Sequence, residues 1–469
     1  MPCELLSGTE QEKDLQWPLS SQKISLLSLS LLILNVWRRI LLQLQRMGCT
    51  SSIPKRYPVL GRKKKKRNSI NEVVIFVPSF QIPTAIDFLH PLRGLVSRDI
   101  IDRLSGLRGR IVSLAESNDL VVLSYVLELQ QALDEYLPLV LGLTIKESNL
   151  ESSVEFKWKM QGDDGQETCL ANVWYELLSV VHMKAVLSLM EANLVLFPRV
   201  SLDHESERVV SEDSKKVAVD LLLRASGCFD YCVHHILVNL PLHIMKNLPN
   251  NLHESMLEAM SVQALAQAVE LQLGLALECE KATLSVKRRL ACEAVSYFTQ
   301  AHYCLSGCNT SDGYGKKLLL FIQWKYLEIK AAAYYYHGLV MDKGNAPSDH
   351  IGAVGCLFAA DELLRDSKRA CLSFCLAAPI SRVPPLWGVM KHMNKKIPDV
   401  ASKKAQMYGY LLEQDKSCQA LPDLPEFQLS LKPDKYELAD VDASWDNNES
   451  CKHQIQSLKD HLQDEVGSE

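Results

Sequence analysis

The chain has 469 residues, of which 47% are hydrophobic, so it contains enough apolar material for a large buried core. Its formal net charge of −5 excludes a strong overall basic bias towards nucleic acid. The fourteen cysteines do not resemble a disulfide framework, and no Cys-x-x-Cys pair is present, which argues against a zinc site. We therefore expect a reduced, cytosolic protein without a metal.

The first 46 residues contain one uncharged apolar run, at residues 24–37 (ISLLSLSLLILNVW). As a helix it would reach about 21 Å, which is shorter than the roughly 30 Å hydrocarbon core of a bilayer. Acidic residues precede the run and no small-residue cleavage site follows it, unlike in a signal peptide. We expect residues 1–46 to be an extension that is disordered or forms one short helix. An interfacial amphipathic helix is the alternative.

Residues 47–52 (MGCTSS) have the pattern of an N-myristoylation signal, although they lie inside the chain. Myristoyl transfer needs a free terminal glycine, so Gly48 is a substrate only if Met47 is the working start of the protein. We expect that start, with myristate on Gly48 and palmitate on Cys49. If the extension is real, the anchor is masked.

A basic linker completes this segment, because residues 48–67 contain eight basic residues and no acidic one. One myristoyl chain anchors only weakly, and each Lys or Arg near an anionic leaflet adds about 1 kcal/mol. We interpret residues 47–70 as a membrane-binding head. A solvated linker or a nuclear-localisation signal in residues 62–67 (RKKKKR) is the alternative. The basic residues are Lys55, Arg56, Arg62, Lys63, Lys64, Lys65, Lys66 and Arg67.

The body that follows is predicted to be mostly helical. A short β-rich run lies at residues 73–78, and an extended or hairpin segment lies at residues 154–165. Most other segments have helical period, and several end at a proline. The predicted helices cover residues 104–115, 120–137, 170–197, 211–240, 256–282, 286–305, 318–341, 351–378 and 400–412.

Alanine-rich helix faces recur along the central helices at intervals of about 30 to 37 residues. This period is typical of antiparallel helix pairs stacked as in tetratricopeptide arrays, where small residues permit close helix approach. The sequence therefore predicts a mostly α fold, an elongated solenoid of antiparallel helix pairs with a small N-terminal β element.

Four segments of the body together resemble the Bro domain, the endosomal-targeting domain of Alix and of plant Bro-like proteins. They are VVIFVPSFQIPTAIDF from residue 73, MSVQALAQAVELQL from residue 260, WKYLEIKAAAYYYHG at 324–338 and GAVGCLFAADELL at 352–364. The resemblance covers residues 71–431 and leaves 432–469 as an acidic tail. From residue 434 onward, ten Asp and Glu stand against three Lys. The MGCTSS-plus-basic head resembles the plant members in particular.

This resemblance implies a non-catalytic adaptor of the endosomal sorting pathway. It would bind a C-terminal helix of an ESCRT-III subunit through an apolar patch on a concave face, whose residues stay unassigned. The expected location is the cytosolic face of an endosomal or plasma membrane, with a peripheral lipid anchor if translation starts at Met47, and the cytosol otherwise. The alternative is a helical-repeat scaffold for another protein, tethered by residues 24–37 or nuclear through the basic run.

The sequence contains little that indicates a catalytic or ligand-binding motif. The turn at residues 313–317 (GYGKK) lacks the spacing of a phosphate-binding loop and is interpreted as a solvated helix connection. Cys228 and Cys232 lie near His234 and His235, but adjacent residues on a helix point about 100° apart, which disfavours a metal cluster. We expect no catalytic residue, no cofactor, no small-molecule substrate and no nucleic-acid partner.

Overall fold

The structure is a computed structural model of the chain. It describes residues 75–78, 81–117, 122–145, 150–160, 167–196, 211–306, 308, 313–378, 389–414 and 421–446. Contacts divide the chain into the units Met1–Lys66 and Arg67–Glu469, and every described residue belongs to the second unit. The predicted extension and membrane-binding head, with Gly48, Cys49 and the eight basic residues, lie outside the described residues.

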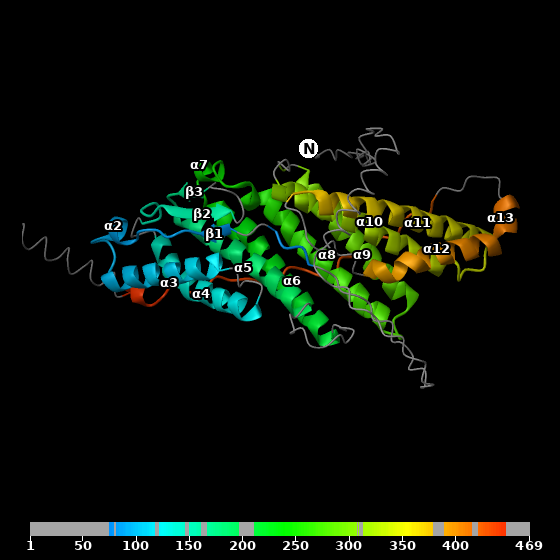
Figure 1. The fold of residues 1–469 in the computed structure, drawn as a ribbon, viewed down its shortest axis with the longest axis horizontal. Coiled ribbons are helices and arrows are strands. Elements are labelled where there is room, and N and C mark those ends of the chain that lie inside the picture. Colours follow the sequence, from blue (N-terminus) through cyan, green and yellow to red (C-terminus); the bar gives the residue numbers. More distant parts are fainter. Residues whose placement is uncertain are drawn as a thin grey trace, which may run out of the picture. The chain divides into compact units, whose positions relative to one another are not determined.

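Helices dominate the described chain and follow one another through the fold (Figure 1). Three of them begin at a side-chain cap, because Ser97, Ser211 and Thr283 accept a hydrogen bond from a first-turn amide of α3, α6 and α9. The helices are α2 Leu89–Leu92, α3 Arg98–Glu116, α4 Leu123–Leu141, η1 Gly142–Thr144, α5 Val173–Leu196, α6 Glu212–Tyr231, η3 Cys232–Ile236, η4 Leu237–Asn239, α7 Leu242–Met245, η5 Asn250–Leu252, α8 Glu254–Glu278, α9 Leu284–Leu305, α10 Gly313–Met341, α11 Pro347–Leu376, α12 Val389–Met407 and α13 Gly409–Gln414.

A small antiparallel sheet has the strand order β1-β2-β3. β1 (Gln81–Pro83) pairs with β2 (Phe156–Met160), which also pairs with β3 (Glu167–Leu170). Phe156 and Trp158 alternate into the core from β2, as the period of a half-buried strand requires. The extended segment predicted here is confirmed.

The β-rich run predicted at residues 73–78 is wrong over its described part, because residues 75–78 form no strand. Their backbone bonds to helix side chains instead. Asn193 of α5 accepts from the Ile75 amide at 2.9 Å and donates to its carbonyl, while Gln267 of α8 accepts from the Phe76 amide at 2.9 Å. Buried backbone groups must be paired, and here the amide side chains of two helices supply the partners.

The central helices form the predicted array of antiparallel pairs. α8 packs between α6 and α9, α9 packs against α10, and α10 packs against α11. Small residues set the close approach: Ala331, Ala332 and Ala333 are fully buried, and a Cβ added to Gly338 would lie 2.9 Å from the Ala353 carbonyl oxygen. The mostly α fold with a small β element is therefore confirmed.

α5 is buried over most of its circumference, because α4 and α6 pack against it. It is the one helix among the described residues that is long and apolar enough to cross a membrane, with a mean hydropathy of 1.3. However, 67% of its apolar window is buried inside the protein, as expected for a core helix.

Several predicted helix boundaries differ from the structure; α3, for example, begins at Arg98 and not at residue 104. α4 continues through Pro138, where the loss of one backbone hydrogen bond is offset by the complete burial of Leu139 and Val140. The helix predicted at 211–240 changes at Cys232 into the π turn η3. The helix predicted at 400–412 begins earlier, as α12, and α13 follows it.

Candidate partner-binding surface

Two exposed valines lie near the beginnings of two helices. Val217 in the second turn of α6 and Val286 in the first turn of α9 are each 45% exposed. The first turn of each helix is capped, because Ser211 Oγ accepts from the Ser214 amide and Thr283 Oγ1 accepts from the Val286 amide. Aliphatic side chains on rigid helix turns can dock a partner at a low ordering cost.

α8 brings these two turns to the same end of the helix array. It packs between α6 and α9, and its last residue, Glu278, pairs with Lys215 in the first turn of α6. Residues 279–283 then connect α8 directly to the start of α9. The first turns of α6 and α9 therefore flank the carboxyl end of α8.

Val286 is the first residue of a row along α9. Leu290, Glu293 and Tyr297 follow at intervals of three and four residues, so the four side chains lie on one helix face. Only the first half of this row is open to solvent. Val286 is exposed and Leu290 is half-buried, whereas Glu293 and Tyr297 are buried.

A similar row on α6 runs from Lys216 through Asp220 and Leu223 to Gly227. Lys216 forms an ion pair with Glu212, with 2.8 Å between Nζ and Oε1. The hydrogen bond between them raises the pKa of Lys216 and lowers the pKa of Glu212. The open ends of the two rows, together with Val217 beside Lys216, are called the partner face here. It consists of Glu212, Lys216, Val217, Val286 and Leu290.

The covered halves of both rows lie under the C-terminal strap, defined as residues 421–446, which is largely extended. On α9, Ser430 donates to the Glu293 carboxylate from its amide and from Oγ. Tyr297 Oη donates to the Leu431 carbonyl at 2.6 Å. These contacts fix the strap one helical turn beyond Leu290.

The strap crosses α6 in the same manner. The Asp434 amide donates to the Leu223 carbonyl at 3.2 Å, and a Cβ added to Gly227 would overlap the Asp434 carbonyl oxygen. Only glycine therefore permits this approach. The Tyr436 ring then packs edge-on against Tyr231, with ring centroids 5.1 Å apart.

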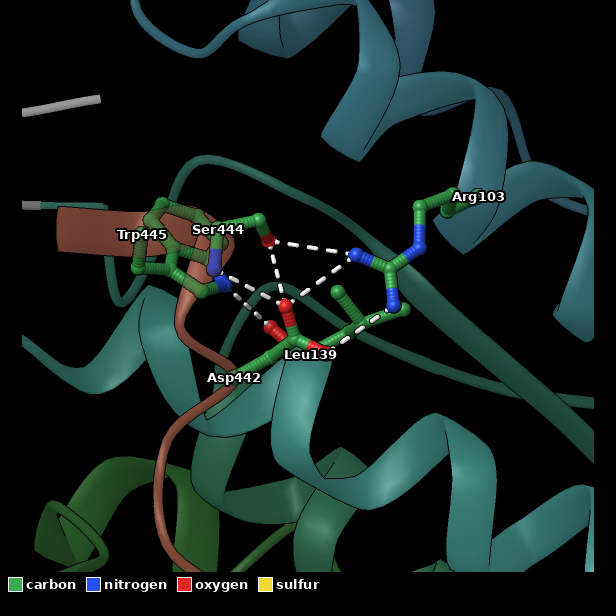
Figure 2. Close-up of polar contacts among 5 residues, drawn as sticks. All are labelled: Arg103, Leu139, Asp442, Ser444 and Trp445. Atoms are coloured by element: carbon green, nitrogen blue, oxygen red, sulfur yellow. Dashed lines mark hydrogen bonds and ion pairs between the residues drawn. The ribbon is translucent and has the colours of Figure 1, made fainter. Parts of the chain in front are cut away.

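Trp445 anchors the far end of the strap. Its ring is 2% exposed, and its Nε1 donates to the Leu139 carbonyl at 3.1 Å (Figure 2). A Cβ added to Gly142 would overlap the indole, so the missing side chain at Gly142 makes room for it.

An ion pair supports this anchor. Asp442 accepts from both terminal nitrogens of Arg103, at 3.1 Å and 2.9 Å, and Ser444 Oγ donates to Asp442 at 2.6 Å (Figure 2). These bonds hold the pKa of Asp442 well below its usual range. Asp442, Ser444 and Trp445, with their partners, are called the latch.

Two clusters of charge lie inside the fold and are inaccessible to a substrate. Around Glu176, Arg108 forms an ion pair, Trp158 Nε1 donates at 2.7 Å and Tyr136 Oη donates at 3.0 Å. Burial raises the pKa of Glu176, and the Arg108 charge opposes that shift. The second cluster consists of Lys325, Glu270 and Glu328. Both clusters join elements of the core.

The residues considered as a metal cluster are separated by the fold. Cys228 and Cys232 are buried, whereas His234 and His235 are exposed. Within the described ranges, no group of three or more His, Cys, Asp or Glu could hold a metal ion.

Lys317, in the turn predicted to be solvated, is buried. Its ammonium donates to the carbonyls of Phe374 and Ala377 at the carboxyl end of α11. A cation at this position satisfies carbonyls that the helix leaves unpaired, so the residue stabilises the α10–α11 pair.

Three solved structures share this fold. ALIX bound to the SIVmac239 PYKEVTEDL late domain is 17% identical, with a TM-score of 0.56 over 79% of this chain and 51% of that chain. The "ALIX BRO1 CHMP4C complex" is 16% identical, with a TM-score of 0.54 over 79% of this chain and 99% of that one. A Bro1 domain structure described as a basis for endosomal targeting is 15% identical, with a TM-score of 0.51 over 79% and 91%.

At these identities the likeness shows the fold alone. The chain spans about half the length of the ALIX chain in the first structure. No curated protein sequence matches the chain. A family model described as the BRO1-like domain matches residues 95–415, which is more than half of the sequence. The chain therefore belongs to the BRO1-like domain family.

Proposed function

We propose that this protein is a non-catalytic adaptor of endosomal sorting that binds an amphipathic helix of an ESCRT-III subunit on the partner face. One observation carries this assignment: Val217 and Val286 are exposed near the capped beginnings of α6 and α9, on either side of the carboxyl end of α8, and Val217 follows the ion pair of Glu212 and Lys216. The relative in the ALIX BRO1 complex is bound to CHMP4C, and another relative is described in connection with endosomal targeting.

The chemistry of the partner face suits the helix-in-groove mode of recognition, in which apolar side chains of one helix face meet an apolar surface with charged borders. Fully burying a valine contributes about 1.5–3 kcal/mol. Because each valine is already about half buried, further burial contributes roughly 1 kcal/mol per valine. Such an interface supports a reversible complex that can be exchanged.

The binding test uses the purified full chain and a fluorescent peptide of an ESCRT-III C-terminal helix, followed by anisotropy. We expect saturable binding by the wild type and at least a tenfold loss in Val286→Asp, because the introduced carboxylate would be desolvated in the complex. Val238→Asp is the matched control, since Val238 is exposed on η4, away from the partner face. Absence of wild-type binding at high micromolar peptide would refute the partner assignment and favour a scaffold for another protein.

We also propose, from the sequence, that residues 47–70 attach the adaptor to an anionic membrane through lipid on Gly48 and Cys49 and through the basic run. Mass spectrometry of the mature N-terminus tests this proposal. A peptide beginning at myristoyl-Gly48 is expected, and Gly48→Ala should move the protein from membrane to soluble fractions. An acetylated Met1 peptide would contradict the lipid anchor. Nuclear enrichment that survives Gly48→Ala and is lost when residues 62–67 are neutralised would favour the nuclear alternative.

A further inference from the structure

The strap lies on the same faces of α6 and α9 as Lys216 and Val286 of the partner face. On α9, Val286, Leu290, Glu293 and Tyr297 share one face, and Ser430 and Leu431 of the strap bind the last two. The corresponding row of α6 meets the strap at Leu223 and Gly227. The strap therefore borders the partner face, and it leaves both exposed valines uncovered.

The distance from Lys216 and Val286 to the strap matches the width of one helix. Lys216 precedes Leu223 by seven residues, and Val286 precedes Glu293 by seven, so each pair shares one helix face. At about 1.5 Å per residue, each separation is roughly 10.5 Å along the helix axis. An α-helix with its side chains is about 10–12 Å in diameter. The space between these two residues and the strap is called the lane.

A helix that lay parallel to α9 would meet the strap after about two turns. A helix that lay across α6 and α9, alongside the strap, would contact Lys216 and Val286, with Val217 at its outer edge. We propose that the strap is a side wall of the partner site, which orients a single ESCRT-III helix along the lane. This inference rests on the proposed function and adds to it a second binding element outside the helical array.

The latch determines whether this wall is present. Trp445 and Asp442 are bound on α3 and α4, more than ten residues along the strap from Leu431. Partner residues on the lane do not need to reach them. Releasing the latch should therefore weaken helix binding without altering a residue of the partner face. If release of the latch leaves the strap in its bound position for about a tenth of the time, the apparent affinity for the partner helix falls about tenfold.

The experiment compares Trp445→Ala with Val286→Asp in the full chain, using the same peptide anisotropy. Hydrogen exchange of residues 428–436 reports whether the strap has been released. We expect Trp445→Ala to release the strap and reduce affinity about tenfold. Val441→Ala is the control, because Val441 is 41% exposed next to the latch and should change neither readout.

Unchanged affinity with a released strap would overturn the side wall. Increased affinity would also overturn it, because it would show that the strap competes with the partner helix for the site. If the wild type fails to bind, the proposed function fails and this inference fails with it. If the wild type binds and Val286→Asp does not, the function stands and Trp445→Ala alone decides the wall.

A second measurement does not depend on the folding of Trp445→Ala. Photo-crosslinkers placed at Gln428 and Lys432, both on the strap, should each capture the bound peptide, whereas one at Val441 should not. Capture from neither strap position by a chain that binds the peptide would also overturn the proposal.

Discussion

Replacing Glu176 by Gln should destabilise the protein strongly. Glu176 is completely buried and provides the counter-charge for Arg108, which is 2% exposed. The introduced amide would keep an acceptor for Trp158 or Tyr136, but it would leave the Arg108 cation unpaired and point an NH₂ group at the guanidinium. Removing one partner of a buried ion pair costs about 3–5 kcal/mol, which is a large part of the stability of an ordinary domain.

Urea denaturation followed by far-ultraviolet circular dichroism measures this effect. The matched control is Glu135→Gln, which breaks a 3.3 Å pair between Glu135 of α4 and Arg110 of α3. Both control side chains are about 40% exposed, so we expect a loss below about 1 kcal/mol. If Glu176→Gln cost no more than Glu135→Gln, the buried Arg108 would not need its counter-charge, and our reasoning about the core would be refuted.

Three further predictions concern titration and the latch. Burial lowers the pKa of His182 to about 4, so the unfolded chain binds more protons than the folded chain between about pH 6.5 and 4. The free energy of unfolding should therefore fall by up to roughly 3 kcal/mol as the pH is lowered across that window, and His182→Leu should reduce the pH dependence of the urea midpoint there. Since Arg103 depresses the pKa of Asp442, the ion pair should keep the latch bound at pH values above about 4, and the latch should loosen as the pH falls further. Asp442→Asn should loosen the latch already at neutral pH, which would be measured as faster hydrogen exchange in the strap. Gly142→Ala should expel Trp445 and expose the strap to limited proteolysis, and a strap as resistant as wild type would contradict the fit of the indole against Gly142.

The helical array was predictable because its signals are local. The segments predicted at 256–282, 286–305, 318–341 and 351–378 correspond to α8, α9, α10 and α11 within a few residues at most ends. Apolar periodicity, alanine-rich faces and short polar connections act within one or two turns, so they are visible without knowledge of the fold. The same holds for the hairpin of β2 and β3.

The errors occurred where a distant partner overrides a local signal. Residues 75–78 look like a strand, but the side chains of Asn193 and Gln267 take their backbone hydrogen bonds. Lys317 looks like a loop residue, but the end of α11 supplies carbonyls for its ammonium. Burial of its last turn carries α4 beyond Pro138. None of these partners is close in sequence.

The sequence by itself determined the helix pairs, the hairpin of β2 and β3 and the resemblance to a family, because each depends on periodicity or on order along the chain. It placed no residue of the partner face, since exposure of Val217 and Val286 depends on what other helices cover. Residues 427–431 (FQLSL) alternate in the manner of a strand that packs on one side, yet only tertiary structure decided where they lie. The strap is positioned by contacts such as Glu293 with Ser430 and Arg103 with Asp442, which join residues more than a hundred positions apart.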